Sequence, residues 1–281
     1  MKLLTPFFSA LILTLLFFSV ETEAAPTVEQ VKKIIEKNGM PPWKLATEKV
    51  KAMRANPPNA LFATTWKALD SEAEKAAFAR VTNPRDGNDL NALSMWLRWK
   101  ILSENADGRY SYAYAANLNY MLDQKGIPLY PTEAVVFFLH ARLSLAIDGA
   151  RCKDRASPES VVIGYETQPY LRPLIENVSK MSKREKAIAM LEAVTLEELR
   201  GERPLLDGLC TRGAATALKA LSAGRQFVKQ SPNDSESQKL LGETYSIDTS
   251  GIEPSLLSEE EWKTKRRQIL DSHIQSAAES L

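Results

Sequence analysis

Apolar residues recur every three or four positions along most of the chain, the spacing that places them on one face of an α-helix. The clearest series are Val28, Val31, Ile34 and Ile35; Leu90, Leu93, Leu97 and Ile101; and Val135, Phe138, Leu139, Arg142 (through its apolar stem) and Leu145. The best strand candidate is the β-branched run SVVIGY at residues 160–165, and one short run cannot form a sheet alone. The pattern therefore predicts an all-α fold of about ten helices, an irregular bundle or a stack of helical hairpins.

Capping boxes, in which Ser or Thr is followed three residues later by Glu or Gln, mark predicted helix starts. They occur at Thr27…Gln30, Ser71…Glu74, Ser182…Glu185, Thr195…Glu198 and Ser258…Glu261. Two further starts are predicted at Ser157-Pro158 and Ser231-Pro232, because proline is tolerated at the first helical position. Helix ends are predicted before Gly39, Gly108 and Gly126, where glycine can adopt positive φ.

The first residues have the arrangement of a secretory signal peptide. Lys2 precedes an apolar run over residues 7–20, and the small residues Thr22 and Ala24 follow it. We expect cleavage between Ala24 and Ala25. The alternative is an uncleaved membrane anchor, because the apolar segment approaches the length that spans a bilayer.

Two regions are expected after the signal peptide at 1–24. A small helical region covers residues 25–82, and the main helical domain covers residues 90–281. The polar loop TNPRDGND at 82–89 separates them, although the two regions can also be continuous, with the loop as a long connection.

The 281-residue chain contains two cysteines, Cys152 and Cys210. In an exported protein the pair predicts one disulfide. Each cysteine follows an Asp-Gly pair: Gly149 is expected to close a helix from Thr132, and Gly208 to precede a helix from Thr211. The two cysteines are thus expected to join two chain turns of similar chemistry.

Basic residues surround the predicted disulfide. They are Arg151, Lys153, Arg155 and Arg212. The bridge would gather them near the start of the helix expected from Thr211, where free N–H groups favour anions. One interpretation is a pocket for a carboxylate or phosphate-bearing ligand. The other is surface ion pairing with the neighbouring acids Asp148, Asp154, Glu159 and Asp207.

Aromatic residues are concentrated between residues 94 and 122. Tyr110, Tyr114, Leu118 and Met121 fall on one helical face, which predicts core packing, with sugar stacking as the alternative. Tyr112 lies off that face and is expected to be exposed.

The segment SPNDSESQKLLGETY, residues 231–245, contains a short sequence motif. Pro232, Leu241, Gly242 and Tyr245 have the spacing found at the junction between tetratricopeptide repeats. Residues 232–245 therefore resemble that family, and no 34-residue period is visible elsewhere. Because repeat arrays need at least three units, the resemblance implies a helical hairpin that packs like a repeat and not an array.

Several kinds of chemistry are not expected. The two histidines, His140 and His273, are far apart and Cys-x-x-Cys is absent, so neither a zinc site nor another cofactor is expected. His140 lies in an apolar helix and is expected in the core rather than as a general base. The net charge of +1 argues against nucleic-acid binding, and no second apolar run is long enough for stable membrane insertion.

We expect an exported protein of a bacterial periplasm or the extracellular space. The bacterial assignment is an inference, because Asn177 and Asn233 begin Asn-x-Ser sequences that a eukaryotic secretory pathway would glycosylate. The expected role is binding or scaffolding, with a protein or an anionic envelope ligand as partner. The alternative is a hydrolase or transferase acting on envelope polymers through carboxylates, although no motif singles out two of them.

Mass spectrometry of the protein from its native host should detect a chain that begins at Ala25, because Thr22 and Ala24 suit a signal peptidase. A predominant species that retains Met1 and sediments with membranes would instead favour the anchor.

Overall fold

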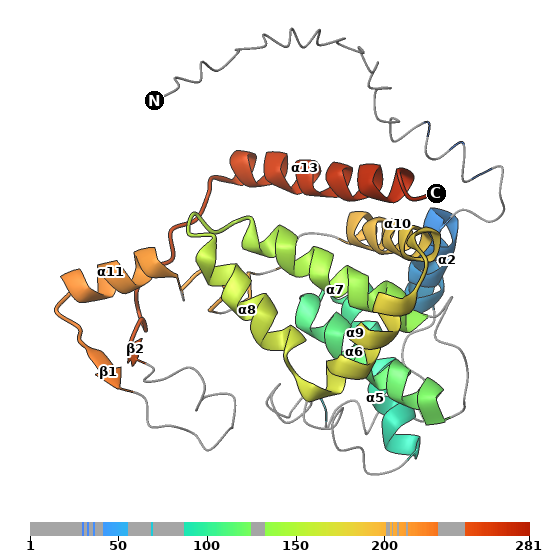
Figure 1. Ribbon diagram of the computed structural model, residues 1–281, viewed down its shortest axis with the longest axis horizontal. Helices are drawn as coiled ribbons and strands as arrows, with labels where there is room; N and C mark the ends of the chain where they lie inside the picture. Colours follow the sequence, from blue (N-terminus) through green and yellow to red (C-terminus); the bar gives the residue numbers. More distant parts are fainter. Residues whose placement is uncertain are drawn as a thin grey trace, which may run out of the picture.

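A computed structural model describes residues 30, 33, 36, 42–55, 69, 87–124, 133–200, 203, 205–206, 208–211, 213–229 and 245–281. Within these ranges the fold is all-α, apart from one small two-stranded sheet (Figure 1). The expected cleavage site at Ala24 and Ala25, the capping boxes starting at Thr27 and Ser71, and the helix start at Ser231 lie outside the described residues.

The elements follow one another as α2 (Pro42–Ala55), α5 (Gly87–Ser103), α6 (Gly108–Gln124), α7 (Glu133–Gly149), α8 (Ala156–Glu166), the 3-10 helix η1 (Pro169–Leu171), α9 (Arg172–Lys180), α10 (Lys183–Leu199), α11 (Ala214–Ser222), β1 (Phe227–Lys229), β2 (Tyr245–Ile247) and α13 (Glu259–Ala278).

Helix α7 is the centre of the bundle. It is buried along nearly its whole length and contacts α6, α8, α10 and α13. Its apolar side chains join one core with α5 and α6, while Leu143 and Ile147 join a second core with α10 and α13. Helix α2 packs on α10 and α5, with an ion pair from Lys49 Nζ to Glu192 Oε1 at 2.6 Å. The proposed boundary at 82–89 stays a prediction.

Two of the predicted capping boxes are confirmed and one is wrong. Ser182 and Ser258 each accept a hydrogen bond from the backbone N–H three residues later, with the reciprocal glutamate contact present. Thr195 instead lies inside α10, where its hydroxyl donates to the Leu191 carbonyl at 2.9 Å. A threonine within a helix can satisfy its hydroxyl in this way without starting a new one.

Several helix boundaries differ from the prediction. Gly108 begins α6 instead of following a helix, and Asn105, with φ of 56°, takes the left-handed conformation after α5. Asparagine adopts that conformation more readily than other residues with a side chain. Helix α11 starts at Ala214 rather than Thr211, and α8 starts at Ala156, so Pro158 lies within its first turn. The predicted end of α7 at Gly149 is confirmed.

The prediction that Tyr112 is exposed is wrong, although core packing of Tyr114 on the same helix is confirmed. Both side chains are buried. Tyr112 packs against Phe138, and its hydroxyl donates to Glu166 Oε1 at 2.8 Å. Helix α6 contacts α5, α7 and α9, so it has no single inward face in its first half.

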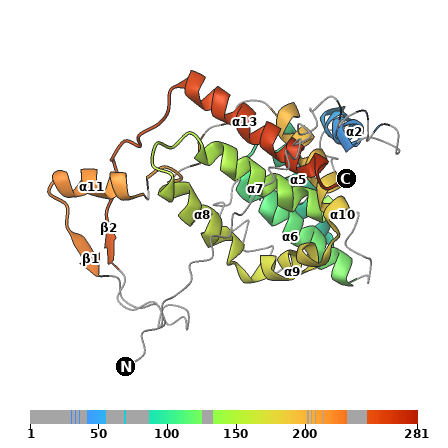
Figure 2. The ribbon, with the colours of Figure 1, turned by 45° about the horizontal axis from the view of Figure 1, so that its top comes forward.

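A small hairpin lies beside α11, away from the main bundle (Figures 1 and 2). Strands β1 and β2 are antiparallel, with Phe227 opposite Ile247, and the helical pattern did not predict them. The run at 160–165 that was the best strand candidate is helical in α8. Tyr245 begins β2, and the rest of the segment that resembles a tetratricopeptide repeat lies outside the described residues, so that resemblance stays a prediction.

Gly108 permits a close approach between α6 and α7. A Cβ atom at this position would lie 2.7 Å from Leu145 Cγ and 2.8 Å from the Ala141 carbonyl oxygen. The carbonyl belongs to the backbone of the central helix and cannot move without shifting α7.

Gly108→Ala should therefore lower the free energy of unfolding by about 1–3 kcal/mol, the usual effect of overpacking a core. The matched control is Gly164→Ala in α8, where no atom lies within 4 Å of the added Cβ. That change should be neutral or stabilising by about 0.5–1 kcal/mol because alanine favours helix. Urea unfolding followed by circular dichroism compares the two, and equal effects would contradict the close-approach argument.

Candidate functional site

Helix α7 presents two different faces to its surroundings. His140, Ser144 and Asp148 are four residues apart and all buried, so they form one polar stripe on the inside of the bundle. Arg142 and Ala146 lie on another face and are exposed. The buried polar cluster lies on the inner face of α7, and the exposed face lines a groove.

The inner stripe is neutralised by arginines that follow α10. Arg203 donates to Asp148 Oδ2 at 2.9 Å, to Glu197 Oε1 at 2.8 Å and to the Ser144 carbonyl at 3.1 Å. Burial raises the pKa of Asp148, an effect that the charge of Arg203 opposes. Burying charges in this way is tolerated because each is paired and hydrogen-bonded.

His140 is completely buried in the same cluster. Its Nδ1 lies 2.9 Å from Ser111 Oγ on α6, and its Nε2 lies 3.1 Å from Arg200 Nη1. Nε2 also lies 3.4 Å from Glu197 Oε2, which can only accept, and the Ser111 hydroxyl can donate or accept, so either tautomer of the neutral imidazole has hydrogen-bond partners at both nitrogens. Burial lowers the pKa of His140 to about 4, so the side chain is a neutral core histidine near pH 7.

Glu197 is the acidic centre of this cluster. Burial alone would raise its pKa, but contacts with the imidazole and the two arginines hold the pKa well below its usual range. Arg200 Nη1 lies 3.5 Å from Glu197 Oε2, and burial lowers the pKa of this arginine to about 10. Arg200 Nη2 also donates to the Ala106 carbonyl before α6.

The predicted disulfide between Cys152 and Cys210 is present, with a Cα–Cα distance of 5.2 Å across a sequence separation of 58 residues. Cys152 also forms a β-bridge with Leu256 in the segment leading to α13. Closing a loop of this length stabilises the fold by about 4 kcal/mol through the entropy of the unfolded chain. The disulfide therefore joins the end of α7 to the segment before α11, and the bridge ties the same turn to α13.

The four basic residues predicted to share an anion site do not meet in one place. Arg151 stacks over the Trp262 ring, with its Cζ 3.9 Å from the ring centroid, and donates to the Arg203 carbonyl at 3.2 Å. Lys153 and Arg155 instead line a groove on another side of the disulfide turn. Arg212 lies outside the described residues.

Among the described residues, Asp148 and Asp154 form no ion pair with Arg151, Lys153 or Arg155. Asp148 is bonded to Arg203, and Asp154 Oδ2 accepts a hydrogen bond from the Ala215 N–H at 2.7 Å. A side chain of the protein itself thus satisfies the N-terminus of α11, which was expected to favour an external anion. Asp207 lies outside the described residues.

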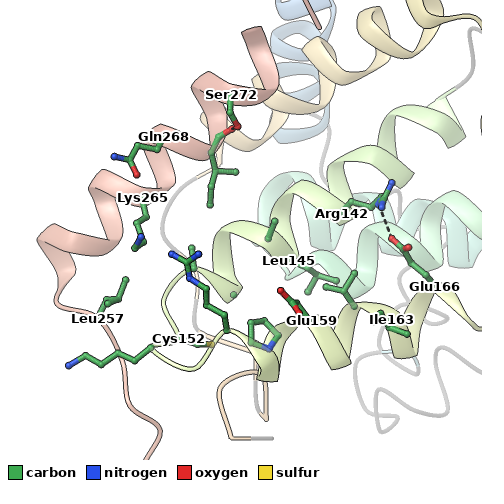
Figure 3. Close-up of a pocket in the computed structure, with 18 residues that line it drawn as sticks. Arg142, Leu145, Cys152, Glu159, Ile163, Glu166, Leu257, Lys265, Gln268 and Ser272 are labelled. Atoms are coloured by element: carbon green, nitrogen blue, oxygen red, sulfur yellow. Dashed lines mark hydrogen bonds and ion pairs between the residues drawn. The ribbon is translucent and has the colours of Figure 1, made fainter. Parts of the chain in front are cut away.

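The groove has a volume of about 780 Å³ and runs between α7, α8 and α13 (Figure 3). It exists because α8 packs on α7 whereas α13 packs chiefly on α10. In Figure 3, Lys265 and Ser272 lie on the α13 side and Glu159 and Ile163 on the α8 side. The apolar part of its wall is formed by Leu145, Pro158, Val162, Ile163, Leu257 and Ile269.

The charges that line the groove are mostly positive. They are Arg142, Lys153, Arg155 and Lys265 against Glu159 and Glu166. Glu166 is already neutralised, because its Oε1 lies 2.8 Å from Arg142 Nε and accepts the Tyr112 hydroxyl. The remaining cations are concentrated near the disulfide turn and the first half of α13.

A second hollow of about 530 Å³ continues the groove beyond the Arg142–Glu166 ion pair, which lines both parts. Its wall includes the apolar residues Phe138, Ile175, Val178 and Met190, with Lys183 and Lys186 on α10. The ion pair therefore lines two adjacent hollows, each of which has apolar wall residues.

Two carboxylates line the groove, Glu159 and Glu166. Glu166 is paired with Arg142, whereas Glu159 forms no ion pair with another described residue. No group of His, Cys, Asp and Glu in the described part of the chain is arranged to hold a metal ion. The enzyme alternative stays an untested prediction.

Within the described ranges, no helix has the length and apolar character needed to cross a membrane.

The inner cluster was not predicted from the sequence. His140 was expected in the core, but its partners Arg200, Arg203 and Glu197 were not predicted. One signal was present: His140, Ser144 and Asp148 are spaced by four in an otherwise apolar helix. Three polar residues on one helical face of a buried segment require partners of their own.

His140 should make stability depend on pH. Its pKa is about 4 in the fold, against about 6.5 for an unperturbed histidine side chain. Between these values the unfolded chain binds more protons, so the free energy of unfolding falls as the pH drops, by about 3 kcal/mol in total. Above pH 6.5 this contribution is constant.

Urea unfolding at pH 7 and at about pH 4.5 tests this dependence in the parent, in His140→Gln and in His273→Gln. The His140 variant should lose about 2–3 kcal/mol less between the two pH values than the parent, whereas the His273 variant should behave like the parent. The comparison cancels the opposing contribution of Asp148, whose pKa is raised by burial. Equal pH dependence in all three proteins would refute the assignment.

Comparison with protein-family models, with curated proteins and with solved structures gives no significant match for this chain. Its functional interpretation therefore depends on the geometry of the groove and of the buried cluster.

Proposed function

We propose that this protein binds an amphipathic molecule with one acidic head group and an unbranched apolar chain, such as a fatty acid, in the groove between α7, α8 and α13. The observation that carries the proposal is the combination, in one groove of about 780 Å³, of an apolar wall with cations that form no ion pair with another described residue. Pockets for small molecules are commonly of this size, with apolar walls and a few charged groups that fix orientation.

The apolar wall favours a hydrocarbon chain over a sugar. Ile163 is 61% exposed, although isoleucine is among the residues most often buried. The half-buried Val162 and Ile269 line the same groove. Covering this surface with a hydrocarbon chain would remove apolar area from water at about 25 cal/mol per Å².

The cations at the disulfide end favour an anionic head group. Arg155 lines the groove from the turn before α8 and Lys265 from α13, and neither forms an ion pair with another described residue. A carboxylate between them would gain two charge-assisted contacts. Lys153 and Arg155, which line this groove, are two of the residues expected from the sequence to form an anion site, whereas Arg151 does not line it.

The second hollow would accommodate the end of a longer hydrocarbon chain. It shares Arg142 and Glu166 with the groove and has an apolar wall. A chain that extends past this ion pair would leave the head group at the disulfide end. We therefore expect affinity to rise with chain length while the head group is kept constant.

Three probes separate the two parts of the proposed ligand: decanoate has both, decan-1-ol has only the chain, and acetate has only the charge. Isothermal titration at concentrations below micelle formation should detect saturable binding of decanoate, at least about tenfold tighter than that of either control. If decanoate binds no more tightly than decan-1-ol and acetate, the proposal is rejected.

Matched variants locate the binding. Ile163→Glu should weaken decanoate binding by about tenfold or more, because it places a charge on the apolar wall. Leu218→Glu is its control, since Leu218 on α11 is 63% exposed and does not line the groove. An equal loss in both variants would show that decanoate adheres to exposed apolar surface in general.

A further inference from the structure

A separate hollow of about 240 Å³ lies between the end of α7, the end of α10 and α13. No described residue lines both this hollow and the groove. Lys263 and Glu198 are its exposed wall, and the buried side chains of Asp148, Arg200 and Arg203 are its inner wall. We call it the arginine hollow.

Among the described residues, positive charge exceeds negative charge around the arginine hollow. Arg151, Arg200, Arg203 and Arg266 all line it. Glu197 is shared among three of them, with nitrogen–oxygen distances of 2.8 Å to Arg203, 3.5 Å to Arg200 and 3.9 Å to Arg266. Among the described residues, Asp148 pairs with Arg203 alone, and the exposed Glu198 pairs with Arg267, which does not line the hollow. These carboxylates therefore leave part of the arginine charge unmatched.

Two buried atoms of residues that line the hollow lack a hydrogen-bond partner among the described residues. They are Arg200 Nε, which can only donate, and Asp148 Oδ1, which accepts while the carboxylate is ionised. Both side chains are only 1% exposed. Buried polar groups are rarely left unpaired, so a molecule that both accepts and donates hydrogen bonds would satisfy the pair.

We propose that the arginine hollow binds inorganic phosphate as the hydrogen phosphate ion. Its unprotonated oxygens would accept from Arg200 Nε and from the guanidinium of Arg266, which match oxyanions in geometry and charge. Its remaining O–H would donate to Asp148 Oδ1. A neutral water would not offset the excess of arginine charge.

The O–H group of hydrogen phosphate distinguishes this ion from sulfate. At pH 8 hydrogen phosphate still carries one proton, whereas sulfate carries none and would place an oxygen lone pair against the Asp148 carboxylate. Isothermal titration of the signal-free chain with sodium phosphate should therefore detect saturable binding about tenfold tighter or more than with sodium sulfate. No saturable phosphate binding, or equal binding of the two anions, would overturn the proposal.

Adjacent residues of α13 provide matched variants, because Arg266 lines the arginine hollow and Lys265 lines the groove. Arg266→Ala should weaken phosphate binding by about tenfold and leave decanoate binding unchanged. Lys265→Ala should leave phosphate binding unchanged. Circular dichroism checks that both variants fold, and equal effects of the two variants on phosphate would contradict the assignment.

Asp148→Asn tests the role of the proton. An asparagine amide can donate to a fully ionised oxyanion, so this variant should bind sulfate as well as it binds phosphate. Retained discrimination in a folded Asp148→Asn protein would refute the contact with Asp148. If that variant does not fold, the Arg266→Ala and Lys265→Ala pair still decides the location of the site. Failure of decanoate to bind would leave these outcomes unaffected.

Discussion

The bonds that the buried guanidinium of Arg203 makes to α7 and α10 hold the two central helices in one register. Its partners are Asp148, the Ser144 carbonyl and Glu197. Removing one member of such a group leaves a buried charge without a partner, which typically costs about 3–5 kcal/mol. Because Asp148 is in the last turn of α7, the same bonds also fix where the chain leaves that helix and turns toward Cys152.

That turn positions both candidate sites. The disulfide at Cys152 and the β-bridge to Leu256 attach it to the segments before α11 and α13. Arg151 then points to Trp262 and the arginine hollow, while Lys153 lines the groove. Arg151 and Lys153, two positions apart in the sequence, thus belong to two different candidate sites. The disulfide and the β-bridge hold the turn that carries both residues.

Helix α13 separates the two sites in a similar way. It lies along α10 and leaves α8 uncovered, so its neighbouring residues Lys265 and Arg266 face the groove and the arginine hollow respectively. We infer a protein with two anion-binding sites of different character. The groove suits a molecule with an apolar chain, whereas the arginine hollow is small, charged and lined by buried groups.

Local interactions, which depend on residues a few positions apart, could be predicted from the sequence. The 3–4 spacing predicted an all-α fold, the boxes at Ser182 and Ser258 predicted two helix starts, and two cysteines allowed one disulfide. Only the tertiary structure decided that Tyr112 is buried and that Arg203 lies between α7 and α10. These outcomes depend on which helices pack together, because burial and ion pairing join residues more than fifty positions apart, and no local pattern specifies such partners.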